Sequence, residues 1–308
     1  MSDRTDLASS TELLDAELPN PRFVDDAYLR WLYDENPHGH AIQRSIDEDG
    51  VRVAHYGLIP QEYRDAGGPT PCMFSLNAVT RSGTQRKGYF TRIGLEIYAE
   101  AAEKGRSFVI GVSNEKSVGA VVKYMGWRHW GPLPVRIVAP LGVSGRGIVH
   151  HPVDAAFLGS PDFERLAADL DQVPATHWTN RWTPEYLRWR LACPHTRYWV
   201  HASPELFAVS TRDHRFGMRA AVILKLVPRG GRSGPLSARR LIAAVCRHHR
   251  APYAVYAGFN RQVPVRGLQP PRRFQPSPLH LILRHLDPGV DQDALVLDTF
   301  EFLDFDAY

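Results

Sequence analysis

The sequence predicts an α/β protein built from two consecutive units of the same plan. Each unit contains, in order, a helix, a hairpin, a strand, a second helix and a further strand, as its apolar periodicity and turn residues indicate. The first helical segment, DAYLRWLYDENPH, recurs almost residue for residue as TPEYLRWRLACPH, so that Tyr28–Trp31 correspond to Tyr186–Trp189. Aromatic helix starts can resemble one another by chance, but the shared order of the later elements favours an internal duplication.

A glycine-rich stretch, GVSGRGIVHHPVD, separates the two units. We therefore expect a flexible leader over residues 1–20, a first domain over residues 21–150 and a second domain over residues 151–308. The leader is polar and acidic and lacks the apolar core of a secretory signal, and no stretch is long enough for a transmembrane helix. The sequence thus predicts a cytoplasmic protein without a membrane segment.

The composition is that of an ordinary globular protein: 44% of the 308 residues are hydrophobic and 23% are charged. The net charge of +4 comes from scattered arginines, and no basic cluster is interleaved with aromatic residues, which argues against nucleic-acid binding. The three cysteines, Cys72, Cys193 and Cys246, show no CxxC spacing, so neither a disulfide framework nor a metal site is expected.

Local sequence signals mark where each helix and strand begins and ends. The first helix starts with acidic residues and stops before Asn36-Pro37, and the hairpin strands flank the turn signal EDG. In the first unit we predict a helix over Asp25–Tyr33, a hairpin over His40–Asp47 and Val51–Leu58, strands over Phe74–Val79 and Ser107–Val112, and a helix between those strands that begins near Phe90 and ends at Gly105. In the second unit we predict a hairpin over Tyr198–Val209, strands over Met218–Val227 and Pro252–Ala257, and a helix over Ala238–His249.

The segment Gln85–Phe90, QRKGYF, lies between a predicted strand and the helix that follows it. In such a turn successive backbone N–H groups at a helix N-terminus point at an anion such as pyrophosphate. Gly88 lets the backbone approach the ligand closely, and Arg86 and Lys87 add positive charge. By itself the hexamer is often only a basic helix start.

The context of this turn resembles the acyl-CoA site of the GNAT superfamily of N-acyltransferases. The family motif has Gln or Arg, two residues, Gly, one residue, then Gly or Ala; Gln85 and Gly88 match it, whereas Phe90 replaces the last small residue. Downstream, GVSNEKSVGAVVKYMGW is similar to the second half of that site, in which a strand ends at Asn114, a short helix follows and Gly126-Trp127 closes it. Two motifs in this order are far more specific than either alone.

The resemblance implies two tandem GNAT-like domains, each a mixed, largely antiparallel twisted sheet flanked by helices. It also implies acetyl-CoA or another acyl-CoA as co-substrate, without a metal. The reaction is attack of a primary amine on a thioester, with a backbone N–H near Val79 as the oxyanion donor. The implied cofactor-binding residues are Ala78, Val79, Gln85, Arg86, Lys87, Gly88, Tyr89, Phe90, Asn114 and Ser117.

The general acid and base are less evident. The family often has a Tyr four residues before the Gly-aromatic pair, but that position is Val122, and Tyr124 is the nearby candidate acid, with core packing as the alternative. The central strand offers no acidic residue. Histidines near their reference pKa can act as bases, although a solvated histidine or a capping aspartate is the competing explanation for each candidate. The base candidates are His38, His40, His55, Tyr56, Asp304 and Asp306, of which we select His38 and His55.

The second unit does not preserve the phosphate turn. Its corresponding segment, PRGGRSGPLS, is glycine-rich but lacks the motif, and Pro235 removes a backbone donor. Gly230, Gly231 and Gly234 leave room for an anion, but a plain flexible loop is favoured. We expect the working cofactor site in the first half and a degenerate second half.

The predicted function is transfer of an acyl group from acyl-CoA, or from an acyl carrier protein, to a primary amine of a small acceptor such as an amino sugar or a natural-product amine. The expected partner is that small molecule, with no nucleic acid and no membrane, and the protein is a monomer or homodimer. Two alternatives remain: a non-catalytic acyl-CoA-binding protein, which the missing acid and base favour, and a Fem-like aminoacyl transferase, against which QRKGYF argues.

Overall fold

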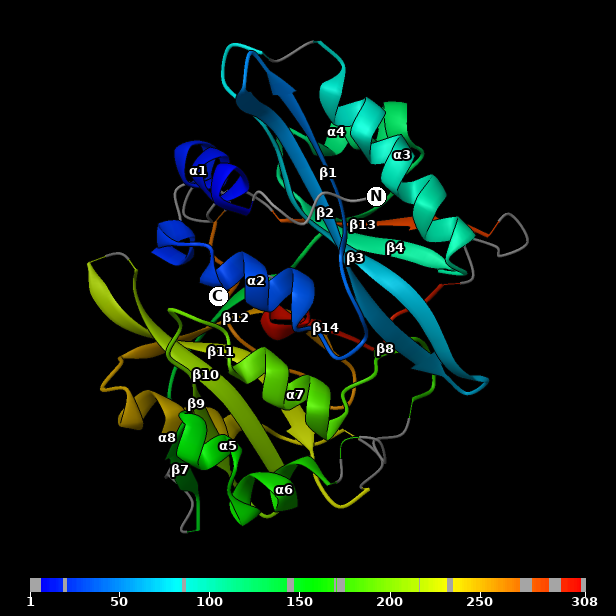
Figure 1. Cartoon of the computed structure of the whole chain (residues 1–308). Helices are drawn as coiled ribbons and strands as arrows, with labels where there is room; N and C mark the ends of the chain where they lie inside the picture. The colour runs from blue at the N-terminus through cyan, green and yellow to red at the C-terminus, as the bar shows by residue number, and fades with distance from the viewer. Residues whose placement is uncertain are drawn as a thin grey trace.

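The computed structural model describes residues 7–18, 21–84, 87–142, 147–168, 170, 175–215, 217–231, 235–271, 279–287 and 295–305. Two twisted sheets lie one above the other in Figure 1, with helices around them. The elements encoded before residue 140 are α1 (Leu7–Glu17), η1 (Pro21–Val24), α2 (Ala27–Asp34), β1 (Ile42–Glu48), β2 (Val51–Asp65), β3 (Gly68–Thr80), α3 (Tyr89–Glu103), β4 (Phe108–Ser113), α4 (Val118–Met125), β5 (Arg128–Pro132) and β6 (Val135–Val138).

The later elements repeat the helix, hairpin, strand, helix, strand order that the sequence predicts. They are β7 (Val149–Pro152), α5 (Ala155–Leu158), α6 (Pro161–Ala167), β8 (Thr179–Asn180), α7 (Pro184–Leu191), β9 (Trp199–Ala202), β10 (Leu206–Arg215), β11 (Met218–Pro228), α8 (Arg239–His248), β12 (Tyr253–Asn260), β13 (His280–His285), β14 (Thr299–Glu301) and η5 (Phe302–Asp304). No helix in the described part of the chain is long and apolar enough to cross a membrane.

The first sheet has the strand order β1-β2-β3-β4-β13-β5, and β8 pairs with the far end of β2. Its described strand pairs are antiparallel except for β3 and β4, which run parallel. The apolar sides of α3 and α4 pack on one face, where Ile97 and Val121 meet Met73. Helices α1 and α2 pack on the other face, where Leu14 and Leu32 join the larger core.

The second sheet has the order β14-β12-β11-β10-β9-β7, and β6 also pairs with β12. Strands β11 and β12 form its parallel pair among the described strands, in the position that β3 and β4 hold in the first sheet. Helix α8 covers one face of this sheet, because its residues Leu241, Ile242 and Val245 pack on Ala221 and Ile223. Both sheets are therefore mixed and largely antiparallel, which confirms the predicted fold class.

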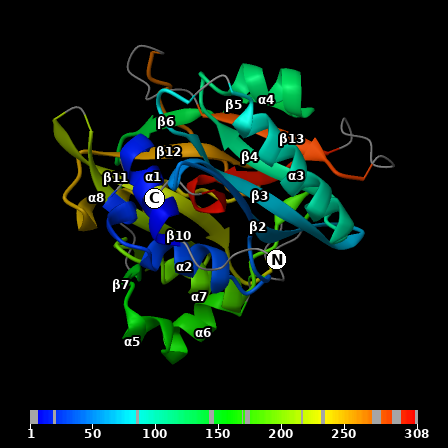
Figure 2. The same ribbon diagram turned by 45° about the horizontal axis from the view of Figure 1, so that its top comes forward.

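Each sheet contains a strand from the opposite half of the chain. Strand β13, encoded near residue 280, lies between β4 and β5 of the first sheet, with His280 opposite Ser113 and His285 opposite Phe108. Conversely, β6 of the first half pairs with β12 of the second sheet. Figures 1 and 2 both show β13 running among the strands of the first half. The glycine-rich stretch before residue 150 thus separates the repeated units in sequence, but the sheets exchange strands across it.

The two repeated helices meet at the centre of the molecule. Trp31 on α2 donates its indole N–H to the carbonyl of Trp189 at 2.9 Å, and Trp189 on α7 donates in return to the carbonyl of Trp31 at 3.1 Å. The two rings stack with centroids 4.7 Å apart. This reciprocal contact joins residues 158 positions apart, and it gives the predicted duplication a physical role as the seam between the halves.

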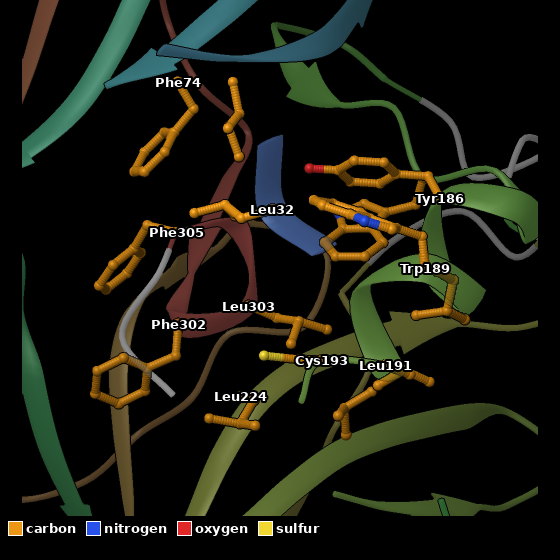
Figure 3. Close-up of a cluster of buried hydrophobic side chains, with 14 of the residues drawn as sticks. Leu32, Phe74, Tyr186, Trp189, Leu191, Cys193, Leu224, Phe302, Leu303 and Phe305 are labelled. Carbon is orange, nitrogen blue, oxygen red and sulfur yellow. The ribbon is translucent and has the colours of Figure 1, made fainter. Parts of the chain in front are cut away.

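A single core cluster crosses this seam. Figure 3 shows Leu32 and Phe74 of the first half together with Trp189 and Leu224 of the second, and the C-terminal segment lies among them. Phe302, Leu303 and Phe305 of that segment are buried. All three cysteines are buried free thiols.

The C-terminal segment also brings buried charges into the second sheet. Strands β11 and β12 are paired from Ala220/Tyr253 to Ile223/Tyr256, and beyond those residues no further pairs form between them. Near this end the ammonium of Lys225 lies 2.6 Å from Asp304 and 3.2 Å from Glu301. Burial alone would lower the pKa of Lys225, but the two carboxylates outweigh this effect and raise it. Asp304, a candidate base in the sequence, therefore forms a buried ion pair.

Glu301 gives the protein a testable pH dependence. Burial raises the pKa of its carboxyl from 4.5 to about 7, so the folded state holds the proton more tightly than the unfolded state. The resulting stability is complete below pH 4.5 and is lost as the pH rises through 7. We expect wild type to lose on the order of 3 kcal/mol of unfolding free energy relative to Glu301→Gln over that window. Denaturant titrations at several pH values measure this; parallel pH profiles would contradict it.

Candidate functional site

The parallel strands of the first sheet separate at their carboxyl ends. Strands β3 and β4 pair only from Met73/Val109 to Ser75/Gly111, although β3 continues to Thr80. Helix α3 follows β3 and helix α4 follows β4, so the N-termini of both helices face this opening. A gap at the carboxyl ends of parallel strands, next to helix N-termini, is the usual place for an anionic ligand in α/β folds.

Strand β3 carries a bulge at this gap. Arg81 donates its N–H to Val53 at 2.8 Å, and Val79 lies opposite His55 in the same ladder. The register of β3 against β2 shifts just before Val79, so Asn77 and Ala78 form a bulge opposite Tyr56 where regular pairing is interrupted. Asn77 has a left-handed φ of 52°. Both predicted residues of this stretch, Ala78 and Val79, therefore lie at or next to the bulge of β3, where the strand extends beyond its pairing with β4.

The predicted phosphate turn ends in a left-handed glycine. Gly88 is the residue before the first turn of α3 and has φ of +77°, which glycine adopts at little cost. A Cβ built there would meet nothing within 4 Å, so the space in front of the helix is open. Gln85 and Arg86, the other members of the motif, lie outside the described residues. The described end of the turn fits a phosphate group.

A carboxylate lies beside this turn. Both oxygens of Glu48, the last residue of β1, are 2.9 Å from the ammonium of Lys87, and the hydroxyl of Tyr89 donates to the same carboxylate. The hydrogen bond with Glu48 raises the pKa of Lys87. Phe90, by contrast, stacks on Tyr56 with centroids 5.5 Å apart. Lys87 and Tyr89 thus both bind the carboxylate of Glu48 beside the turn, whereas Phe90 packs on the sheet.

Polar residues after β4 shape the start of α4. The side-chain oxygen of Asn114 accepts hydrogen bonds from the backbone N–H of Lys116 at 2.9 Å and of Ser117 at 3.0 Å. The hydroxyl of Ser117 also lies 2.7 Å from that of Ser113. Asn114 therefore caps the turn into α4, and both of the predicted residues here, Asn114 and Ser117, lie at the end of β4 where the gap opens.

A chain of hydroxyl groups fixes the base of the gap. The hydroxyl of Tyr56 bonds to Ser75 at 2.7 Å and to Tyr98 at 2.6 Å, and the indole of Trp127 donates to Tyr98 at 3.0 Å. The chain thereby ties β2, β3, α3 and the Gly126-Trp127 pair together. Because Tyr56 makes these bonds inside the core, its part is structural, and the predicted strand-helix-strand unit is held rigid below its ligand-facing end.

The predicted acid and bases lie in different surroundings. Tyr124 is 59% exposed on α4, with the ammonium of Lys123 4.9 Å from its ring centroid. His38 lies against Tyr186 of the second half, and burial lowers its pKa. His55 is fully buried on β2, opposite Val79 of β3, and burial lowers its pKa to about 3. These residues do not form one cluster: Tyr124 is at the surface, His38 at the seam and His55 in the core.

His55 belongs to a buried polar network that ends at the gap. Its Nε2 lies 2.9 Å from the hydroxyl of Tyr33 and its Nδ1 2.9 Å from the hydroxyl of Ser45. Asn77 donates its amide N–H to the same Tyr33 hydroxyl at 2.9 Å. A Cβ on Gly57 would lie 2.8 Å from this hydroxyl, so Gly57 makes the space for it. The network fixes the orientation of Asn77, and His55 is a neutral member of it.

A second ionisable cluster lies at the end of β4 and was not anticipated from the sequence. His280 Nε2 is 2.8 Å from a carboxylate oxygen of Glu115, and His280 Nδ1 is 2.9 Å from Nε2 of His129. His280 comes from β13, which the sequence assigns to the second unit. No local signal joins it to His129, 151 residues away, because only the exchange of β13 into the first sheet brings them together. Among the described residues no group of His, Cys, Asp and Glu is arranged to hold a metal ion.

Comparison with known proteins gives structural likeness only. A scan against protein-family models finds no match, and a search of curated proteins finds no significant match. Among solved structures, the chain is similar to a GCN5-related N-acetyltransferase from Anabaena variabilis, with a TM-score of 0.60 and 12% identity over 90% of this chain and 69% of that one.

Two further solved structures match nearly the whole chain. One is a putative acetyltransferase from Pyrococcus horikoshii, with a TM-score of 0.57 and 10% identity over 96% of this chain and 90% of that one. The other is a tandem GNAT protein from the clavulanic acid biosynthesis pathway, with a TM-score of 0.53 and 11% identity over 94% of this chain and 97% of that one. Together with the two mixed sheets and their parallel strand pairs, these likenesses show that the chain has the tandem GNAT fold.

Proposed function

We propose that this protein is a CoA-dependent N-acyltransferase that works through its first half. One contrast between the halves carries the proposal. In the first sheet the parallel strands separate beside Gly88, in front of which the space is open. In the second sheet β11 and β12 also stop pairing, but the buried cluster of Lys225, Glu301 and Asp304 lies near that position. Gly230 and Gly231 of the second unit are equally open, so the buried ion cluster is the difference between the halves that supports a ligand site in the first.

The residues present fit an acyl-CoA, which would supply the thioester when bound. The N–H groups after Gly88 would hold its phosphates, and Lys87 would join them by exchanging the carboxylate of Glu48 for a phosphate. A backbone N–H at the bulge of β3, from Ala78 or Val79, would stabilise negative charge on the thioester oxygen as the amine attacks. The remaining rate enhancement would come from holding the amine and the thioester together in a rigid gap.

We further propose that the acceptor is the primary amine of a small molecule, such as an amino sugar or a natural-product amine. An acyl carrier protein is an alternative donor. The protein would act in the cytoplasm, as a monomer or homodimer, where its three buried thiols stay reduced. A non-catalytic acyl-CoA-binding protein is the second candidate, because the gap-facing stretch of β3 from Ser75 to Thr80 carries no acidic residue.

Calorimetric titration with acetyl-CoA tests the proposal. We expect one molecule bound per chain, because the second sheet has a buried ion cluster where a second ligand would lie. A subsequent assay of thiol release with a panel of primary amines separates a transferase from a binding protein. Two molecules per chain would contradict the one-site assignment, and no binding at all would contradict the proposed function.

A further inference from the structure

Asn77 lies at the open edge of β3, beside the backbone that would bind the thioester. Pairing between β3 and β4 ends at Ser75, and the bulge of β3 begins at Asn77. The Cα of Asn77 is one peptide, about 3.8 Å, from that of Ala78, a proposed source of the oxyanion-binding N–H. Asn77 also has a left-handed φ of 52°, a conformation that few side chains tolerate and that is frequent at ligand sites.

The amide group of Asn77 is bound on one side and open on the other. Its Nδ2 donates to the hydroxyl of Tyr33 at 2.9 Å. Its Oδ1 has no hydrogen-bond partner among the described residues and is not one of their enclosed polar atoms, so it is open to solvent. An amide fixed through its nitrogen presents an acceptor oxygen. The group that it suits is the N–H or O–H of a ligand.

The network behind Asn77 is buried and uncharged. The hydroxyl of Tyr33, from α2, lies 2.9 Å from Nε2 of His55. The other ring nitrogen of His55 lies 2.9 Å from the hydroxyl of Ser45 on β1. Tyr33 and His55 are buried, and burial lowers the pKa of His55 to about 3, so its imidazole is neutral. The network therefore orients Asn77 without offering an ionised group to a ligand.

Charged side chains on α1, β1 and β2 around this network are bound to other partners. Arg52 on β2 pairs with Asp47 on β1 at 3.0 Å. On α1, Glu17 accepts a backbone N–H from the turn after β3 at 2.7 Å, and Glu12 lies 3.8 Å from Arg81. Because these carboxylates are already bound, the amide oxygen at the gap meets a ligand without a counter-charge from them.

We propose that Asn77 binds the attacking amine through Oδ1 and that this contact selects an amine that is neutral near neutral pH; this rests on the acyltransferase function proposed above. The amide oxygen accepts one N–H of the amine, which leaves the nitrogen lone pair free for the thioester. As the C–N bond forms and the C–S bond breaks, the other N–H proton passes to the departing sulfur. The N–H bound to Asn77 stays in the product amide.

The acceptor class follows from the uncharged site. An α-amino group has a pKa of about 8 and a lysine-type amine one of about 10.4, so their neutral fractions at pH 7 differ roughly 300-fold. A carboxylate in place of the amide would favour the ammonium ion, which has no lone pair for attack. The site therefore suits a weakly basic primary amine, of the α-amino type, better than a strongly basic one.

Wild-type pH profiles test this selection without any variant. Amines of the two classes are compared by thiol release from acetyl-CoA. We expect kcat/KM at pH 7 to be at least about tenfold higher for α-amino compounds, and to level off near the pKa of each amine. A profile that levels off at the same pH for both classes, or a preference for lysine-type amines, would overturn the selection.

Asn77→Gly separates the amide group from the backbone conformation. Glycine adopts a left-handed φ readily, so this variant keeps the bulge and removes only the side chain. We expect kcat/KM for the amine to fall about 10- to 100-fold, with acetyl-CoA affinity by calorimetry unchanged. The matched control is Arg250→Gly, because Arg250 also has a left-handed φ, of 53°, and is exposed in the turn after α8. It should change neither quantity.

The outcomes separate this contact from the function on which it rests. If wild type binds acetyl-CoA and releases thiol, but Asn77→Gly stays within about twofold of it, Asn77 serves only the bulge; the proposal is then wrong and the transferase stands. Loss of acetyl-CoA affinity in a folded Asn77→Gly would also overturn the proposal, because it would place Asn77 in the cofactor site. If wild type releases thiol with no amine, both the contact and the transferase are wrong.

Discussion

Gly88→Asp should abolish acetyl-CoA binding, with a loss of affinity of at least about 100-fold. The substitution places a side chain in the open space where the phosphates would approach the first turn of α3, and it adds a negative charge opposite them. Two unit charges 4 Å apart interact by about 1 to 4 kcal/mol between water and a protein surface, and loss of the close backbone approach adds to this. Calorimetry on the folded variant measures the effect.

The control for this substitution is Gly217→Asp. Gly217 has a φ of +72°, close to the +77° of Gly88, and a Cβ there would likewise meet nothing within 4 Å. Both variants therefore carry the same added carboxylate and a similar backbone strain, but Gly217 lies in the second half, at the start of β11. Acetyl-CoA affinity should be retained in Gly217→Asp. Equal affinity in wild type and Gly88→Asp would refute the phosphate turn.

A chain cut to residues 1–150 should fail to fold cooperatively. Strands β4 and β5 do not pair with each other, because β13 lies between them, so the fragment would have two unpaired strand edges in the middle of its sheet. It would also lose the tryptophan pair of the seam and the apolar residues near the C-terminus that share its core. Exposed apolar surface of this kind leads to aggregation. We expect no sharp unfolding transition and aggregates by size-exclusion chromatography.

Coexpression of residues 151–308 as a separate chain is the control for this truncation. That fragment supplies β13, α7 and the C-terminal segment, so the two fragments together should give a soluble complex with the mass of the intact protein. A monomeric 1–150 fragment that unfolds cooperatively would show that the first sheet needs no strand from the second half.

The local elements and the fold class were predictable from the sequence because each rests on short-range signals. The helix expected from near Phe90 to Gly105 is α3, which ends at Glu103, and the strand expected over Ser107–Val112 is β4. Helix periodicity and capping depend on residues a few positions apart, so they can be read along the chain. The glycine before this helix was also read from the sequence, and Gly88 adopts the left-handed φ of +77° that glycine reaches at little cost.

The positions of the buried charges, and the contacts of His280 with Glu115 and His129, were not predictable from the sequence. Asp304 reads as a candidate base in a C-terminal tail, yet it is buried against Lys225, 79 residues away. Likewise, Glu48 reads as the end of a hairpin strand, but its carboxylate holds Lys87 at the phosphate turn. A charged side chain looks the same in sequence whether water or an opposite charge surrounds it, and only the packing of distant segments decides which.

By itself, the sequence determined the repeated order of helices and strands, and it predicted a phosphate turn in the first unit and its loss in the second. These features depend on apolar periodicity, turn residues and motif spacing within short stretches. The tertiary structure alone decided that β13 and β6 change sheets. It also decided that His280 meets His129 and Glu115. The physical reason is that strand pairing and register between distant segments are fixed by which faces can be buried together, a property of the assembled core.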